Sequence, residues 1–255
     1  MCELLGMSAN VPTDICFSFS GLMKRGGETG PHRDGWGITF YEGKGSRTFK
    51  DPEPSCRSKI AQLLEQYPIK SCAVIGHIRQ ANRGGVNLQN THPFERELWG
   101  RNWTFAHNGQ LTDYRALEVG AFMPVGNTDS ELAFCYLLGQ MKDRFAKAPR
   151  NPVTLARFLA KHADVLRQKG VFNMLLTDGT LMFAYCTSKL HWLTRKAPFG
   201  KAHLVDSDWE IDFSQETTPT DVVTVIATEP LTKDEPWNKM DTGEWLMLKD
   251  GVPVS

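Results

Sequence analysis

Segments with β-strand character lie at both ends of this chain, and segments with helical spacing cluster between them. Tight-turn signals join several strand segments: Gly43–Gly45 divides the β-rich run 34–51, and Asp178-Gly179 divides the run 171–186. Tight turns join antiparallel strands, whereas a doubly wound parallel sheet needs regular strand–helix alternation, which this chain lacks. We therefore predict an α+β fold in which helices cover the outer faces of two mainly antiparallel sheets.

The individual elements follow from the spacing of apolar residues and from turn signals. We expect helices at 14–24, 55–67, 128–145 and 152–169. We expect strands at 2–9, within 34–51, and at 72–78, 102–111, 171–186, 190–195, 221–228 and 243–251. The polar segment 82–99 is expected to be a loop, and Asn108-Gly109 is expected to form a turn that ends its strand.

Size and composition narrow the class of protein. The 255 residues can bury one large core, and we find neither a repeat nor a linker, so residues 1–255 are predicted to form a single domain. The 29 basic and 29 acidic residues balance, which gives no overall field for nucleic acid or an anionic membrane. No apolar run is long enough to span a membrane, and the first residues do not resemble a secretion signal. We therefore expect a cytoplasmic protein that binds neither nucleic acid nor membrane.

The six cysteines show no C-x-x-C pair and no spacing typical of zinc modules, so we expect reduced thiols. Cys72, Cys135 and Cys186 lie in apolar stretches and are expected to be core residues. Cys2 is distinguished by its position alone. If Met1 is removed, Cys2 carries a thiol nucleophile and a free α-amine base on one residue. A cysteine at this position could equally be accidental.

Four further stretches carry candidate chemistry. Arg79, in GHIRQANRGG, follows an apolar strand and could bind a carboxylate through two hydrogen bonds, although a solvated arginine is the simpler reading. Asn108 and Gly109, in FAHNGQL, could donate two hydrogen bonds to one oxyanion, although the pair alone reads as an ordinary turn.

In GNTDSE, Thr128 and Glu131 fit a capping box, which places Asp129 in the first turn of a helix. The helix dipole alone explains a carboxylate there, but Asp129 could also bind an ammonium group. In RDGWGI, residues 33–38, the glycines would let backbone approach a site closely.

Taken in chain order, these motifs resemble the class II glutamine amidotransferases: an N-terminal Cys, D-x-x-G, G-H-x-R, H-P, H-N-G and a T-D-x-E helix start. The resemblance covers essentially the whole chain, and the segment VIATEPLT with the GEW that follows it resembles the standalone YafJ-type members. It implies the four-layer αββα sandwich of the N-terminal-nucleophile hydrolases. It also implies a glutaminase-type amidohydrolase that works through a thioester, without a metal or another cofactor.

The resemblance also implies a role for each residue. Cys2 matches the nucleophile after loss of Met1, Asn108 and Gly109 match the oxyanion-hole pair, and Arg79 and Asp129 match the residues that bind the α-carboxylate and α-ammonium of glutamine. The chain departs from the family pattern at 80–83, where several members carry W-A-T-H.

Three functions remain open at this point. The chain could be a glutaminase subunit that passes ammonia to a separate synthase. It could be a standalone hydrolase of glutamine or another γ-glutamyl compound. It could also be a non-catalytic glutamine sensor, although a sensor would not need the thiol. His77, His92 and His107 show no ligand spacing, and we expect them to be hydrogen-bonded structural residues rather than a metal site.

Overall fold

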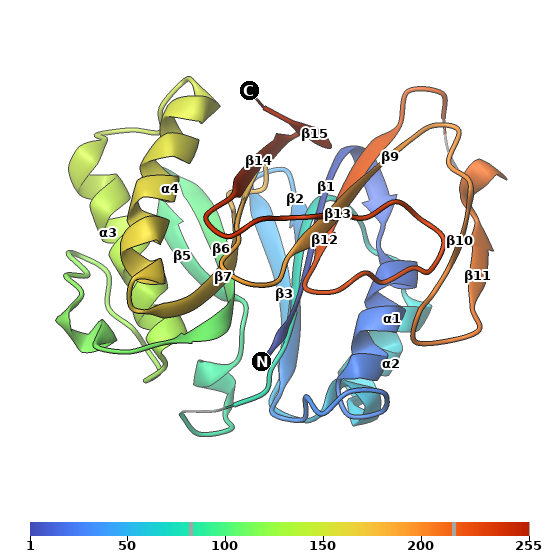
Figure 1. The fold of residues 1–255 in the computed structure, drawn as a ribbon, viewed down its shortest axis with the longest axis horizontal. Helices are drawn as coiled ribbons and strands as arrows, with labels where there is room; N and C mark the ends of the chain where they lie inside the picture. Colours follow the sequence, from blue (N-terminus) through green and yellow to red (C-terminus); the bar gives the residue numbers. More distant parts are fainter. Residues whose placement is uncertain (82–83, 216–217, 255) are drawn as a thin grey trace.

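The computed structural model describes residues 1–81, 84–215 and 218–254. Two β-sheets lie face to face, with one helix pair on the outside of each sheet (Figure 1). This arrangement is the predicted four-layer αββα sandwich, and the predicted fold class is confirmed.

The first sheet has seven strands in the order β13-β9-β12-β1-β4-β2-β3, and every pairing in it is antiparallel. Its strands are β1 (Glu3–Asp14), β2 (Trp36–Glu42), β3 (Gly45–Asp51), β4 (Lys70–Ile78), β9 (His191–Lys196), β12 (Val222–Ala227) and β13 (Asn238–Lys239). The strand β1 lies at the centre of this sheet, between β12 and β4, so the chain is buried from Cys2 onward although Met1 itself is exposed.

The second sheet has six strands in the order β15-β14-β8-β7-β6-β5, again all antiparallel. Its strands are β5 (Phe94–Leu98), β6 (Arg101–Leu111), β7 (Gly170–Thr177), β8 (Leu181–Tyr185), β14 (Trp245–Lys249) and β15 (Val252–Pro253). A separate hairpin consists of β10 (Lys201–His203) and β11 (Glu210–Asp212).

Two helix pairs cover the outer faces of the sheets (Figure 1). The helices are α1 (Cys16–Arg25), α2 (Lys59–Gln66), α3 (Asp129–Arg144) and α4 (Pro152–Arg167), and four short 3-10 helices occupy 55–57, 88–90, 114–116 and 213–215. One apolar cluster joins α1 and α2 to the first sheet, and another joins α3 and α4 to the second. A third cluster, which includes Leu4, Ile75, Leu175 and Ile226, lies between the two sheets.

The structure differs from the sequence predictions at two elements that matter for the site. β6 does not end at Asn108-Gly109 but continues to Leu111, because both residues pair with β7 rather than turn away from it. The strand β5 lies within the segment that we expected to be a loop, since charged residues interrupt the apolar alternation of this edge strand.

Cys135 and Cys186 are buried as predicted, but Cys72 is only half-buried, near the start of β4. All six cysteines are free thiols. Within the described part of the chain, no helix is both long and apolar enough to cross a membrane.

Candidate active site

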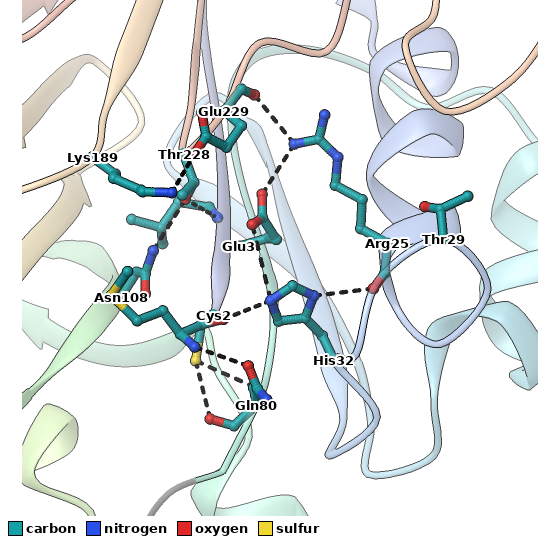
Figure 2. Close-up of polar contacts among 12 residues, drawn as sticks. Cys2, Glu3, Arg25, Thr29, His32, Gln80, Asn108, Lys189, Thr228 and Glu229 are labelled. Atoms are coloured by element: carbon teal, nitrogen blue, oxygen red, sulfur yellow. Dashed lines mark hydrogen bonds and ion pairs between the residues drawn. The ribbon is translucent and has the colours of Figure 1, made fainter.

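Strand register brings Cys2 beside Arg79 and Gln80. Glu3, the first residue of β1, pairs with Ile78, the last residue of β4. Because the strands are antiparallel, the residue before β1 must lie next to the residues after β4. The Cys2 thiol accordingly accepts a hydrogen bond from the Gln80 backbone N–H at 3.4 Å and lies 3.6 Å from the Gln80 carbonyl oxygen (Figure 2).

The Cys2 thiol is held in its protonated form. Burial raises its pKa to about 11, even though the Gln80 backbone, the N-terminal ammonium and the Arg79 guanidinium all act to lower it. The nucleophilic form of cysteine is the thiolate, so this thiol needs a base beside it to react near neutral pH.

Asn108 on β6 and Leu4 on β1 come from different sheets and are joined through Thr228, the residue that follows β12. The Thr228 hydroxyl accepts the Leu4 backbone N–H at 2.9 Å and the Asn108 side-chain Nδ2–H at 3.3 Å (Figure 2). Asn108 is fully buried, and its Oδ1 has no hydrogen-bond partner within the described residues. A buried acceptor without a partner is costly, so this oxygen is available to a group that enters the site.

Gly109 lies inside β6 and not in a turn, which corrects the prediction. It is paired with Phe172 on β7, and a Cβ at this position would lie 1.9 Å from the Val171 carbonyl oxygen. The glycine is therefore required by the close approach of β7 rather than by turn geometry.

Asp129 is the first residue of α3, as predicted, and its Oδ2 accepts the Leu111 backbone N–H at 2.7 Å. The preceding Thr128 accepts the Glu131 N–H at 3.2 Å, which is the predicted first half of a capping box. The Glu131 carboxylate does not complete the box. It accepts the Val125 and Gly126 N–H groups at 3.0 and 2.6 Å, and Arg96 on β5 forms an ion pair with it at 2.5 Å.

Arg79 follows β4 directly, as predicted, and its side chain is almost fully buried. Its guanidinium donates to the Gly85 carbonyl oxygen at 3.1 Å. The RDGWGI segment packs against the same region: Asp34 accepts the Ala81 N–H at 2.7 Å. Gly37 lies so close to the His92 carbonyl oxygen that a Cβ would be 2.3 Å from it, which is the close backbone approach expected of these glycines.

A single polar pocket brings most of these residues together. Cys2, Arg79, Gly109 and Asp129 all line it, together with Gln80, Ala81, His92, His107, Gln110, Thr128 and Ser130. Asn108 bonds Thr228 and is not among the described lining residues. Of the segment 80–83, Asn82 and Arg83 lie outside the described residues.

A family comparison settles where this chain belongs. The model of the family "Glutamine amidotransferases class-II" matches residues 1–255. The chain is a class II glutamine amidotransferase by family.

Full-length relatives agree with this membership. The chain is 68% identical over 254 residues to the Escherichia coli K12 protein named "Putative glutamine amidotransferase YafJ", with 100% of both chains covered. It is 48% identical over 255 residues to a protein of Haemophilus influenzae with the name "Putative glutamine amidotransferase", covering 100% of this chain and 86% of that one.

Solved structures share the fold. A crystal structure of a "predicted glutamine amidotransferase" from Pseudomonas aeruginosa PA01 has a TM-score of 0.80 and 54% identity, and both chains are covered completely. The glutamine phosphoribosylpyrophosphate amidotransferase of Bacillus subtilis has a TM-score of 0.64 at 17% identity, covering 99% of this chain and 48% of that one. At that identity the likeness concerns the fold alone.

Three buried histidines belong to the surroundings of this pocket: His92 and His107 line it, and His77 contacts both. His107 lies 2.8 Å from the Ser130 hydroxyl and 3.1 Å from the Val171 carbonyl oxygen, and His77 lies 3.1 Å from the His107 carbonyl oxygen. His92 stacks on His77 with ring centroids 4.1 Å apart, and within the described residues neither of its ring nitrogens has a partner. The prediction of hydrogen-bonded histidines is therefore right for His77 and His107 and wrong for His92.

Burial lowers the pKa of all three histidines, to about 3 for His77, so the rings are neutral near pH 7. In the described ranges, no three His, Cys, Asp or Glu side chains gather where they could hold a metal ion.

Two amidotransferase residues escaped the sequence analysis, although both shape the site. Thr228 orients the Asn108 amide, and Asn173 on β7 donates to the Asn108 carbonyl oxygen at 2.9 Å. Asn173 also accepts the backbone N–H groups of 187–189 at 2.9 to 3.2 Å. Asn173 belongs to no motif. Thr228 lies within the VIATEPLT segment, but its role depends on contacts that only the folded chain creates. A buried Asn inside an apolar strand was the one signal available.

Proposed function

We propose that this protein hydrolyses the side-chain amide of glutamine, or of another γ-glutamyl amide, through a covalent thioester on Cys2, and releases ammonia and glutamate. One observation carries the proposal: a single pocket holds a buried thiol, a guanidinium from Arg79 and a carboxylate from Asp129. These three groups match the three groups of such a substrate: the thiol matches the side-chain amide, the guanidinium the α-carboxylate, and the carboxylate the α-ammonium.

In the first step, the α-amine of Cys2 acts as the base once Met1 has been removed. The ordinary pKa of an α-amine is about 7.7–8.0, so a useful fraction is neutral at pH 7. It takes the thiol proton directly or through a water molecule, and the thiolate attacks the amide carbon. While Met1 is attached, the Cys2 nitrogen is an amide and cannot take the proton.

The tetrahedral oxyanion then needs hydrogen-bond donors. The Asn108 Nδ2 and the Gly109 backbone N–H fit this task, because one Nδ2–H already donates to Thr228 and the other can donate to the oxyanion. The α-ammonium returns its proton to the leaving nitrogen, and the C–N bond breaks to release ammonia. Water then attacks the thioester and releases glutamate, which restores the thiol.

The charged ends of the substrate set its orientation. The Arg79 guanidinium would bind the α-carboxylate, and the Asp129 carboxylate would bind the α-ammonium. Asp129 is suited to this role, since the Leu111 N–H and the first turn of α3 hold its carboxylate in place.

The destination of the ammonia is the open part of the proposal. A separate synthase could accept ammonia, or the chain could hydrolyse a γ-glutamyl compound on its own. A glutamine sensor is disfavoured because the buried thiol and its neighbouring donors would then have no task. The free cysteines fit the reduced conditions of a cytoplasm, and we propose that location.

Steady-state hydrolysis of glutamine tests this function. We expect the protein to release ammonia and glutamate in equal amounts. We expect Cys2→Ala to abolish turnover but to retain glutamine binding in a calorimetric titration. Hydrolysis by Cys2→Ala at the rate of the unchanged protein would contradict the proposal.

A further inference from the structure

We propose that His32 is a positioning residue that accepts a hydrogen bond from the α-amine of Cys2 after Met1 has been removed, and so directs the amine lone pair toward the thiol. This inference rests on the proposed function, because it concerns the base of that reaction. His32 belongs to none of the motifs that predicted the site.

In the chain that still carries Met1, His32 contacts the first peptide group. Its Nε2 lies 2.5 Å from the Met1 carbonyl oxygen (Figure 2). That oxygen is about 2.3 Å from the Cys2 nitrogen in any peptide group. The Nε2 is therefore no farther than about 5 Å from the nitrogen that becomes the α-amine. This separation lies within reach of one water molecule or of a small movement of the new N-terminus.

The second ring nitrogen decides what Nε2 can do. While Met1 is attached, each ring nitrogen faces a carbonyl oxygen, that of Arg25 at 3.1 Å from Nδ1 and that of Met1 at 2.5 Å from Nε2. Removal of Met1 takes away the carbonyl beside Nε2 and leaves the one beside Nδ1. A carbonyl oxygen only accepts, so a neutral ring then keeps its proton on Nδ1. A neutral ring protonated at Nδ1 presents a lone pair at Nε2. The free α-amine of Cys2 can donate to that lone pair. Removal of Met1 therefore replaces the acceptor beside Nε2 with a donor.

A buried ion-pair network holds the ring in this place. The His32 side chain is 9% exposed, and its Nε2 lies 3.9 Å from a carboxylate oxygen of Glu3. Arg25 binds the other oxygen of Glu3 at 3.0 Å and Asp206 at 2.8 Å. The Arg25 guanidinium also donates to two backbone carbonyl oxygens, of Glu229 and Pro230. Because α1, β1 and the segment after β12 all contribute, the ring has little freedom to turn away.

A fixed acceptor matters because a terminal amine rotates freely about its bond to Cα. One hydrogen bond to His32 would fix that rotation and leave the amine lone pair facing the thiol. Misplacement of a reacting group by about 1 Å can lower a rate about 100-fold, so even a single orienting contact affects the reaction.

Several charged or titratable groups surround His32 and Cys2 and bear on any pH profile. They are Glu3 on β1, Arg25 on α1, His77 and Arg79 near the end of β4, Asp206 after β10, and Glu229 after β12. All of them are kept in the test below, so that differences between variants arise from position 32.

The test compares His32→Leu, which removes the acceptor, with His32→Gln, which keeps an acceptor but does not titrate. Each protein carries a cleavable leader that leaves Cys2 as its first residue, so that removal of Met1 does not influence the result. His203→Gln is the matched control, since His203 is exposed and bonded to Asp234 and Glu210 on the β10–β11 side. The readouts are the rate of Cys2 alkylation by 6-diazo-5-oxo-norleucine from pH 5 to 9, followed by intact mass, and the melting temperature.

We expect His32→Leu to react about tenfold to 100-fold more slowly at pH 7.5. An acceptor favours the protonated amine, so its loss should lower the pKa of the amine and move the acid limb of the profile to lower pH. His32→Gln and the control should stay within about threefold of the unchanged protein, with the acid limb in place.

Equal rates for His32→Leu and the unchanged protein would overturn the proposal. Equal losses in both His32 variants, with lowered melting temperatures, would also overturn it, because they would indicate a purely structural role. If the unchanged protein forms no adduct, the proposed function itself fails. If it forms an adduct and His32→Leu behaves identically, only the role of His32 fails.

Discussion

Thr228 connects the two halves of the site through one hydroxyl group. It accepts hydrogen bonds from the backbone N–H of Leu4, two residues after Cys2, and from the Asn108 side chain, which come from different sheets. The distance between nucleophile and oxyanion donor therefore depends on a residue that touches neither reacting bond.

We predict that Thr228→Val lowers kcat for glutamine hydrolysis about tenfold to 100-fold with little change in KM, because the Asn108 amide loses its orienting acceptor. Thr228→Ser should recover most of the rate. Thr194→Val is the matched control, since the Thr194 hydroxyl bonds the Thr224 hydroxyl on the neighbouring strand. A Thr228→Val enzyme with unchanged kcat would contradict this role.

Asp129 gives a second prediction at this scale. Asp129→Asn keeps the shape of the side chain but removes the charge that would bind a substrate ammonium. We expect KM for glutamine to rise about tenfold or more, with a smaller change in kcat. A matched assay with an N-acetylated glutamine, which lacks the ammonium, should show little difference between the two proteins. Equal losses on both substrates would argue against an ammonium site.

The sequence predicted these residues unevenly. Cys2, Arg79 and Asp129 lie where their motifs placed them, because each stands at the start or end of an element whose apolar pattern is clear. The Asn108-Gly109 pair was read as a turn, because Asn-Gly is the commonest short turn signal and its competing partner is distant in sequence. That partner is Val171 on β7, whose carbonyl oxygen leaves no room for a side chain at Gly109.

At the scale of elements, the pairing of β6 with β7 leaves no space for a side chain at Gly109. A methyl group on Gly109 would lie 1.9 Å from the Val171 carbonyl oxygen, so one strand must move. We predict that Gly109→Ala lowers the free energy of unfolding by about 2 kcal/mol or more and abolishes turnover.

Denaturant unfolding measures the stability effect of Gly109→Ala. Gly200→Ala is the control, because no described residue lies within 4 Å of a Cβ at Gly200, and the free energy of unfolding of this variant should change little. Equal stability of the two variants would show that β6 and β7 separate easily, contrary to this description.

The loop 84–91 is tied to the start of α3 by Asn90, which is fully buried. Its side chain donates to the Asn127 Oδ1 at 2.9 Å and to the Gly85 carbonyl oxygen at 3.1 Å, and the same carbonyl oxygen accepts from Arg79. We predict that Asn90→Ala raises KM for glutamine about tenfold while kcat changes less, since Arg79 loses its support. The exposed Asn238→Ala on β13 is the control, and an unchanged KM in Asn90→Ala would contradict the coupling.

Elements whose apolar period is uninterrupted were predictable within a few residues, as for α3 and α4. The edge strands β5, β13 and β15 were not, because short or charged edge strands carry little apolar alternation. The hairpin β10–β11 has only three residues in each strand and gave no signal.

At the scale of the whole molecule, the two-sheet sandwich followed from tight turns and from the clustering of helices in the middle of the chain. The order of strands did not follow, because it depends on long-range pairings such as β1 with β12. That pairing brings Thr228 beside Leu4 and completes the site. The assignment of residues 1–255 to one domain stays a prediction.

Three neutral, buried histidines make the stability of the whole fold sensitive to acid. Burial lowers their pKa values in the folded state, to about 3 for His77, whereas an unfolded histidine has a pKa of about 6.5. Below pH 6.5 the unfolded chain therefore binds more protons than the folded chain, and stability falls as pH falls. Each such histidine contributes up to about 1.4 kcal/mol per pH unit to this loss.

We predict that His92→Leu reduces the slope of the unfolding free energy against pH between pH 6 and 4. The expected reduction corresponds to about one proton taken up on unfolding, which is about 1.4 kcal/mol per pH unit. Unfolding in guanidinium chloride measures this slope. His203→Gln should leave that slope unchanged, since His203 is exposed and its pKa is raised by Asp234 and Glu210. An identical slope in His92→Leu and the unchanged protein would show that His92 is not held neutral.

The central claim is that Cys2 is an N-terminal nucleophile that recognises glutamine. The most direct measurement is the intact mass of the purified protein before and after incubation with 6-diazo-5-oxo-norleucine, followed by peptide mapping. The account predicts a chain that has lost Met1 and that gains one adduct, located on Cys2. A chain that begins at Cys2 and gains no adduct, or gains one on another cysteine, would contradict it.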